Sequence, residues 1–122
     1  MAKSDNKKQQ GELKALRDAL NLAERKKNYP AMVEAAQAII ALGERAPALG
    51  VMVCLYHKDL GTAYLKLLEY DKALASFKTA HAGLVKYRAT HKLKYPEDWL
   101  NELIAIERLI EKIERVHFKG VV

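Results

Sequence analysis

The chain has 122 residues, half of them apolar and 30% charged, with a net charge of +6. This length and composition fit one helical domain with a core of its own, and no stretch approaches the ~20 apolar residues that cross a bilayer. The moderate excess of cations favours acidic partners. Because the start lacks the apolar core of a secretory signal and Cys54 is the single cysteine, we expect a cytoplasmic protein without an internal disulfide.

The first part of the chain predicts a basic tail and two helices. Residues 1–10 carry three lysines and almost nothing apolar, which is typical of a flexible tail. Leucines and alanines recur at helical spacing from about Gln9 to Lys27, and cations fill the last turn of this expected helix. Pro30 suits the first position of a second helix, which we expect to run to Leu42 and to stop at Gly43.

The rest of the chain predicts three more helices. We expect them from about Val51 to Leu68, from Asp71 to His91 and from Pro96 to His117. Glu97 and Asp98 would lie in the first turn of the last helix, where anionic side chains suit the helix dipole. That helix also carries a broad apolar stripe, which consists of Leu100, Leu103, Ile106, Leu109, Ile110, Ile113 and Val116. The expected fold class is therefore all-α, with about five helices.

Small and large side chains follow a fixed order along the third and fourth expected helices. Small residues stand where two helices must approach closely, and aromatic rings stand where a gap must be filled. The residues concerned are Leu60, Gly61, Tyr64, Ala73, Phe77 and Ala80. This order resembles the tetratricopeptide repeat, whose signature runs L-G-x2-Y and then A-x3-F-x2-A. His57 and Val85 depart from it, because they stand where the family often has Trp and Pro.

The first two expected helices resemble a degenerate copy of the same repeat. A shift of 41 residues places Tyr29 on Tyr70 and keeps the apolar positions of the two copies in step. The resemblance implies antiparallel helix pairs stacked in a superhelix. Its parts are a first repeat over about 11–44, a second over about 51–91 and a capping helix over about 96–117, all within one domain at 11–122.

In tetratricopeptide proteins the first helix of each repeat lines an inner groove that binds peptides. The residues of this chain that would line such a groove are Lys14, Arg17, Asn21, Glu24, Arg25, Leu55, Lys58, Thr62, Leu65 and Lys66. Five of them are cations and one is an anion, and cations beside an amide hold a carboxylate through charge-assisted hydrogen bonds. The resemblance therefore implies a non-enzymatic adaptor that binds a peptide segment, and the charge favours an acidic segment.

Arg17 and Asn21 lie one turn apart and resemble the Lys/Asn pair of the carboxylate clamp found in some members of the family. Asp59 stands where the second repeat of the clamp has Asn, and Asp98 and Glu102 stand where the clamp has Lys and Arg. We therefore expect a looser basic groove and not a complete clamp. The competing interpretation is that these cations are ordinary solvated side chains on helix faces.

Two further interpretations compete with the groove. Two repeats are fewer than the three or more that such stacks need for stability, so the chain could be a self-associating scaffold. The last expected helix would then meet a second copy through Leu103, Ile106, Ile110 and Ile113. Basic residues interleaved with aromatics over Lys86 to Lys94 could contact nucleic acid, but a solvated helix terminus explains them better, so nucleic acid is not an expected partner.

No residue pattern predicts catalysis, a metal site or a cofactor. There is no nucleophile elbow and no phosphate-binding loop. The four histidines lack the spacing of metal ligands, and Cys54 lies among apolar residues, where a buried and unreactive thiol is the expected state. The sequence predicts a binding protein and does not identify its partner.

Overall fold

The computed structural model describes residues 2–118, which form five α-helices and contain no strand. The helices are α1 (Ala2–Arg25), α2 (Tyr29–Arg45), α3 (Val53–Lys66), α4 (Tyr70–Thr90) and α5 (Leu100–Ile113), with a 3-10 turn at Pro47–Leu49 and a π-helical turn at Glu114–Phe118. This confirms the expected all-α fold with about five helices. Met1, in the expected tail, and residues 119–122, at the end of the expected domain, lie outside the described residues. None of the described helices is long and apolar enough to cross a membrane.

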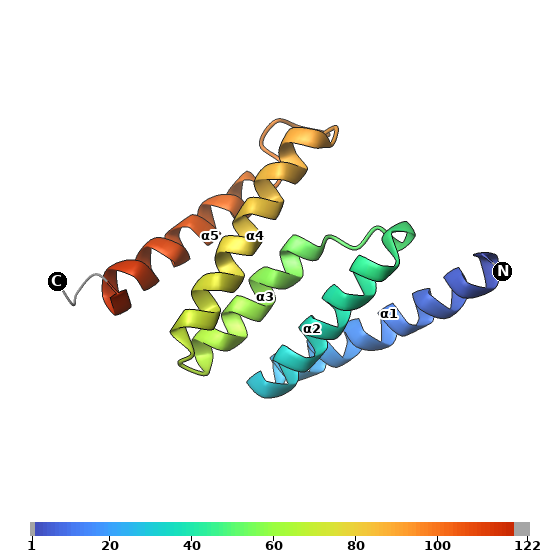
Figure 1. Ribbon diagram of the computed structural model, residues 1–122, viewed down its shortest axis with the longest axis horizontal. Coiled ribbons are helices and arrows are strands. Elements are labelled where there is room, and N and C mark those ends of the chain that lie inside the picture. The colour runs from blue at the N-terminus through green and yellow to red at the C-terminus, as the bar shows by residue number, and fades with distance from the viewer. Residues whose placement is uncertain (1, 119–122) are drawn as a thin grey trace.

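Each helix packs against the next one along the chain, so α1 to α5 lie side by side (Figure 1). Two apolar clusters form the core. One joins α1, α2 and α3 around Met32, Ile39 and Leu42, and the other lies between α4 and α5 around Phe77 and Ile106. Most contacts between helices join helices that follow one another in the sequence. The helices therefore form an open stack, in which both sides of the layer of helices remain accessible.

The six residues that carry the repeat signature do pack at the junction of α3 and α4. Five of them are buried, and the sixth, Tyr64, is partly buried and accepts a hydrogen bond through its hydroxyl from Nε2 of Gln37 at 3.1 Å. A Cβ atom on Gly61 would lie only 2.8 Å from Cε1 of Phe77. Glycine at this position therefore lets α3 approach α4 closely over a fully buried aromatic ring.

The turns inside the two helix pairs have the same backbone pattern, 41 residues apart. Lys27 and Leu68 both adopt a left-handed conformation, with φ of 55° and 62°. The amide of Asn28 donates to the carbonyl of Ala23 at 2.8 Å, and the equivalent bond from Glu69 to Tyr64 is 2.9 Å long. The second helix of each pair then begins at a tyrosine, Tyr29 in α2 and Tyr70 in α4. The two turns therefore share one backbone geometry at the 41-residue spacing found in the sequence.

The limits of the first two helices differ from expectation. The first helix begins at Ala2 and not near Gln9, because the polar residues before Leu13 continue the same helix. Gly43 does not end the second helix, which runs on to Arg45. Gly43 is buried, and a Cβ atom there would lie 3.0 Å from Cβ of Val51. This glycine therefore serves close packing against the start of α3, and Pro47 follows the true end of α2.

The expected start of the last helix near Pro96 is also wrong. A turn over residues 95–99 precedes α5, and Trp99 takes a left-handed φ of 66° directly before it. Asp98 therefore does not lie in the first turn of α5 but accepts a hydrogen bond from the amide of Tyr95 at 3.0 Å. Arg88 of α4 holds this turn, because its guanidinium donates to the carbonyls of Pro96 at 2.6 Å and Asp98 at 3.0 Å.

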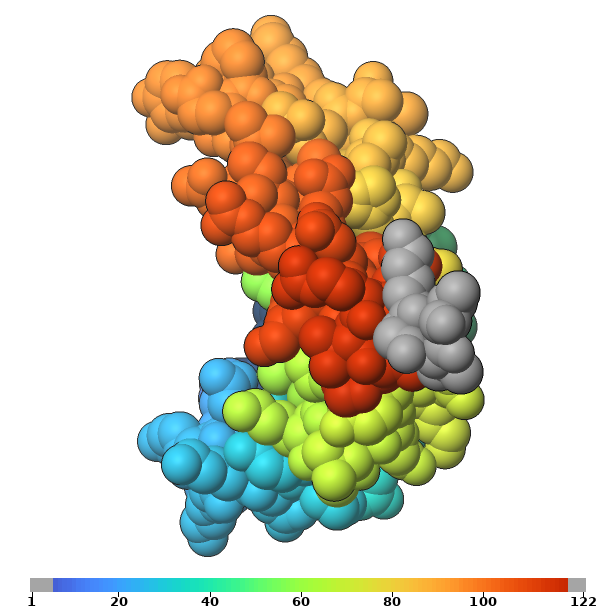
Figure 2. All heavy atoms as spheres, turned by 90° about the vertical axis from the view of Figure 1, so that its left-hand side faces the viewer, coloured from blue at the N-terminus to red at the C-terminus, as the bar shows by residue number. Residues whose placement is uncertain are grey.

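Alternate helices meet along one face of the stack. Nε of Arg17 on α1 donates to the hydroxyl of Tyr56 on α3 at 2.9 Å, and Lys58 on α3 forms an ion pair with Glu102 on α5. These contacts place α1, α3 and α5 along a common surface. Figure 2 shows that the molecule is hollowed between the last part of α1, in blue, and the turn before α5, in orange. The hollowed face is therefore the one along which α1, α3 and α5 lie.

Candidate functional site

A hollow of about 410 Å³ lies between α1 and α3, and it is the centre of the candidate site. Its lining consists of Arg17, Leu20, Asn21, Glu24, Gly50, Met52, Leu55, Tyr56 and Asp59. Four residues expected from the sequence to line a groove therefore lie together here: Arg17, Asn21, Glu24 and Leu55. The helical spacing of the lining residues explains their convergence, since Arg17, Asn21 and Glu24 share one face of α1, as Leu55 and Asp59 do on α3.

Apolar side chains make up part of the wall of the hollow. Leu20 is buried, Met52 and Leu55 are partly buried, and all three contribute to the lining. The ring of Tyr56 stands beside them with its hydroxyl bonded to Arg17. Met52 and Tyr56 were not expected in the groove. Met52 lies in the connection before α3, and the contact of Tyr56 with Arg17 joins two helices that are far apart in the sequence.

Lys58, one of the five cations expected in this groove, forms an ion pair within the chain. The ammonium of Lys58 pairs with the carboxylate of Glu102, and the Lys58 side chain is only 26% exposed. The hydroxyl of Thr62, which was also expected in the groove, donates to the carbonyl of Lys58 within α3. Both side chains therefore make contacts within the chain and offer little to a peptide.

Asp59 is one of the two acids that line the hollow. Its side chain is partly buried, and no donor in the described part of the chain bonds to its carboxylate. Burial and the nearby acids Glu24 and Glu102 raise the pKa of Asp59 to about 6, although Lys58 acts in the opposite direction. At neutral pH the hollow therefore contains a carboxylate that is poorly solvated and close to two others.

The remaining expected groove residues lie elsewhere or keep to the surface. Lys14 is 80% exposed and pairs with Asp18 on its own helix at 3.0 Å. Arg25 lies at the end of α1 and lines another hollow, of about 430 Å³, together with Asp18, Asn21 and Glu24. Leu65 packs against the α4–α5 core, and Lys66 is exposed in the last turn of α3.

The charge within the hollow differs from the cationic groove expected from the sequence. Arg17 is the one cation among its lining residues, and Glu24 and Asp59 are both acids. Asp59 could have been found from its spacing, because it lies one turn after Leu55 on the face that continues to Thr62. In the sequence, Asp59 is compared only with the clamp, which has an amide at this position, so it is not among the expected groove residues.

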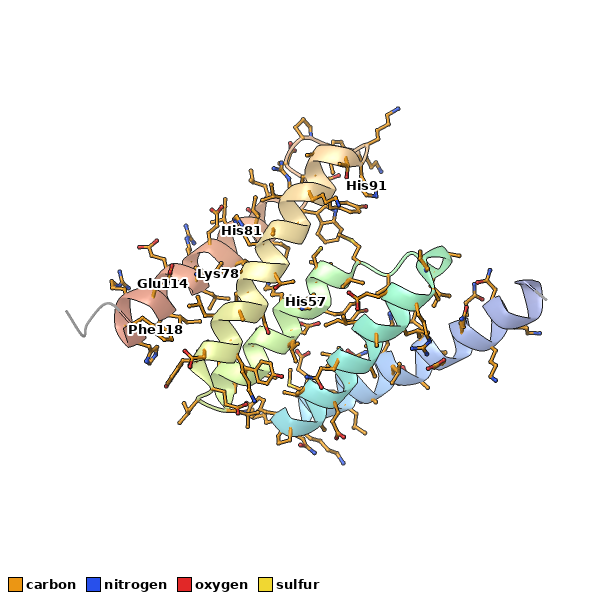
Figure 3. All side chains as sticks on the ribbon, in the orientation of Figure 1. His57, Lys78, His81, His91, Glu114 and Phe118 are labelled. Atoms are coloured by element: carbon orange, nitrogen blue, oxygen red, sulfur yellow. The ribbon has the colours of Figure 1, made fainter. Side chains whose placement is uncertain are left out.

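A second hollow, of about 650 Å³, lies between the connection before α3 and the last part of α4. His57 and His91, labelled in Figure 3, line it together with Cys54. Burial lowers the pKa of His57, although Glu44 opposes this, and burial raises the pKa of the Cys54 thiol. The neutral thiol fits the expected unreactive state, and no group of three metal ligands occurs in the part of the chain that the structure describes.

The residues expected to mediate self-association or nucleic-acid binding make contacts within the chain. Leu103, Ile106 and Ile113 are buried in the α4–α5 core, while Ile110 is partly buried and Val116 is 54% exposed beyond the end of α5. A second copy could reach the three buried side chains only if α5 separated from α4. In the basic segment at Lys86–Lys94, Arg88 is occupied by the turn that precedes α5.

No family model matches the chain, and neither a curated protein nor a solved structure matches it significantly. The likeness to tetratricopeptide proteins therefore depends on the signature residues and on the duplicated turn.

Proposed function

We propose that the chain is a non-enzymatic protein-interaction module that binds a peptide segment between α1 and α3. The observation that carries this proposal is the hollow in which Arg17, Asn21 and Leu55 converge from two helices of one face. It combines apolar area with polar groups that could orient a main chain, which is the usual composition of a recognition site. The resemblance to tetratricopeptide repeats, which bind peptides on this face, supports the same function.

The interactions divide into two kinds. Met52 and Leu55 would contribute apolar contact area to a bound segment, because both are partly exposed in the hollow. Asn21 is exposed and free of side-chain hydrogen bonds within the described chain, so its amide is available to pair with a peptide bond of the partner. Arg17 is already oriented by the hydroxyl of Tyr56 and keeps its other donors for the partner.

Selection from a random peptide library tests this function. The wild-type chain is immobilised and compared with Asn21→Trp, which fills the hollow without removing a described hydrogen bond, and with Gln10→Trp, an exposed control on the same helix. We expect the wild type and Gln10→Trp to enrich the same peptides and Asn21→Trp to lose them. Enrichment of the same peptides by Asn21→Trp, or no enrichment by the wild type, contradicts the proposal.

A further inference from the structure

This inference depends on the proposed function and concerns the chemistry of the bound segment. We propose that the segment carries an arginine whose guanidinium lies between Glu24 of α1 and Asp59 of α3. The two acids come from opposite walls of one hollow and lie close enough for Glu24 to act electrostatically on Asp59. The partner would thus be a basic segment, in contrast to the acidic one that the sequence favours.

The charges around Asp59 support a cationic partner. Glu24 faces it from α1, Glu102 from α5 and Lys58 from its own helix. The ammonium of Lys58 is paired with Glu102, so Arg17 is the one cation that lines the hollow, beside the two acids Glu24 and Asp59. The hydrogen bond from Arg17 to the hydroxyl of Tyr56 orients its guanidinium without neutralising it. Glu24 and Asp59 make no side-chain ion pair among the described residues, so a positive charge entering the hollow would compensate both.

The apolar part of the hollow fits the rest of an arginine side chain. Leu20, Met52 and Leu55 line the same space as the two acids. A long basic side chain can lay its methylene stem on apolar surface and extend its charged head to polar groups. Arginine fits better than lysine, because its planar guanidinium presents several donors in a fixed geometry and can bond to two carboxylates at once.

Proton linkage gives this site a pH dependence with a defined sign. Burial and the neighbouring acids raise the pKa of Asp59 to about 6, so a growing share of Asp59 is neutral as the pH falls below that value. A guanidinium binds the ionised carboxylate more strongly than the neutral acid. Binding should therefore weaken between pH 7.5 and pH 5, and it should be insensitive to pH in Asp59→Asn.

The test uses four model peptides that differ at one position. Each has the sequence acetyl-Ala-Leu-Xaa-Leu-Ala-amide, in which Xaa is Arg, Lys, Glu or citrulline, the neutral isostere of arginine. Amide chemical shifts of the whole 15N-labelled chain are recorded during titration with each peptide to about 10 mM, which detects dissociation constants in the millimolar range. The amides of Asn21, Glu24 and Asp59 report on the hollow, and that of Gly11, with nothing packed against it, serves as the reference.

We expect the Arg peptide to shift the amides of the hollow at pH 7.5 and to bind about tenfold more tightly than the citrulline peptide, as a charge-assisted contact requires. Asp59→Asn, which keeps the shape of the side chain, should remove that preference. If the Glu or citrulline peptide binds at the same amides as tightly as the Arg peptide, the inference is overturned and the peptide-binding function stands. If no peptide shifts these amides, both are contradicted.

Discussion

The ammonium of Lys58 on α3 is paired with the carboxylate of Glu102 on α5. The pair engages the ammonium of Lys58 with one carboxylate and brings a third acid, Glu102, into the surroundings of Asp59 and Glu24. The groove that the sequence predicts to be cationic therefore has more acids than cations in the hollow between α1 and α3. The helices that bring this about, α1, α3 and α5, are far apart in the chain and adjacent on one face.

The first prediction concerns Asp59 and protein stability. Its pKa is about 6 in the folded chain and 3.8 in the absence of the fold, so the folded state holds this proton more tightly than the unfolded state. Folding stability from this group is therefore greatest at low pH and falls as the pH rises through about 4 to 6. Asp59→Asn should raise the free energy of unfolding by about 2 kcal/mol at pH 7.5.

The pH dependence and an exposed control make this prediction specific. Urea denaturation at pH 7.5 and pH 4 should show that the gain from Asp59→Asn disappears at the lower pH. Asp18→Asn, which removes an exposed acid from α1, should change stability by less than about 0.5 kcal/mol. An Asp59→Asn variant less stable than the wild type at pH 7.5 would show that the carboxylate has a compensating partner.

The second prediction compares two glycines in helices. Gly61→Ala should lower the free energy of unfolding by about 1–3 kcal/mol, because the added methyl group meets the buried ring of Phe77 within 3.0 Å. Gly11→Ala should raise it by about 0.5–1 kcal/mol, because nothing lies within 4 Å and alanine favours the helix. Thermal unfolding of both variants checks the pair. Equal effects at the two positions would contradict the close approach of α3 and α4.

The third prediction concerns the basic segment at the end of α4. Arg88→Met should destabilise the chain by about 1–3 kcal/mol, because the variant loses two hydrogen bonds to the turn before α5. Lys92→Met should change stability by less than about 0.5 kcal/mol, since this exposed lysine has no described ion pair. Urea denaturation measures both. A larger effect from Lys92 than from Arg88 would refute the role of Arg88 in holding the turn.

The fourth prediction concerns α5 and self-association. Because Ile106 is fully buried within its own chain, Ile106→Ala should cost about 2–5 kcal/mol of stability without altering the oligomeric state. Val116→Ala, at an exposed position, should cost less than about 0.5 kcal/mol. Sedimentation should give a monomer for the wild type at micromolar concentration. A wild-type dimer that Ile106→Ala dissociates would support the scaffold interpretation instead.

The sequence predicts much of the fold because helical spacing and the repeat signature are local patterns. The start of α5 could not be predicted in this way. Pro96 and the two acids after it are typical of a helix start, but the side chain of Arg88 on α4 stabilises a turn there. The role of Gly43 could not be predicted for a related reason. A glycine near the end of a helix suggests a stop, but its neighbours Val51 and Val53 require it for packing.

The candidate site could be predicted in part. Helical faces identify Arg17, Asn21 and Leu55, because each follows from its spacing on one helix. The charge of the hollow does not follow from spacing, since it depends on the pairing of Lys58 with Glu102 across two helices. Tertiary contacts therefore decide whether an acidic or a basic partner fits.

A site-specific titration of the Asp59 carboxyl carbon by NMR, without and with the Arg peptide, tests the central claim most directly. The account predicts a midpoint near pH 6 in the free chain, because the carboxylate is desolvated and close to Glu24 and Glu102. Saturation with the peptide should lower the midpoint, since a bound guanidinium favours the ionised form. A midpoint near 3.8 in the free chain, or one that saturating peptide leaves unchanged, would contradict the account.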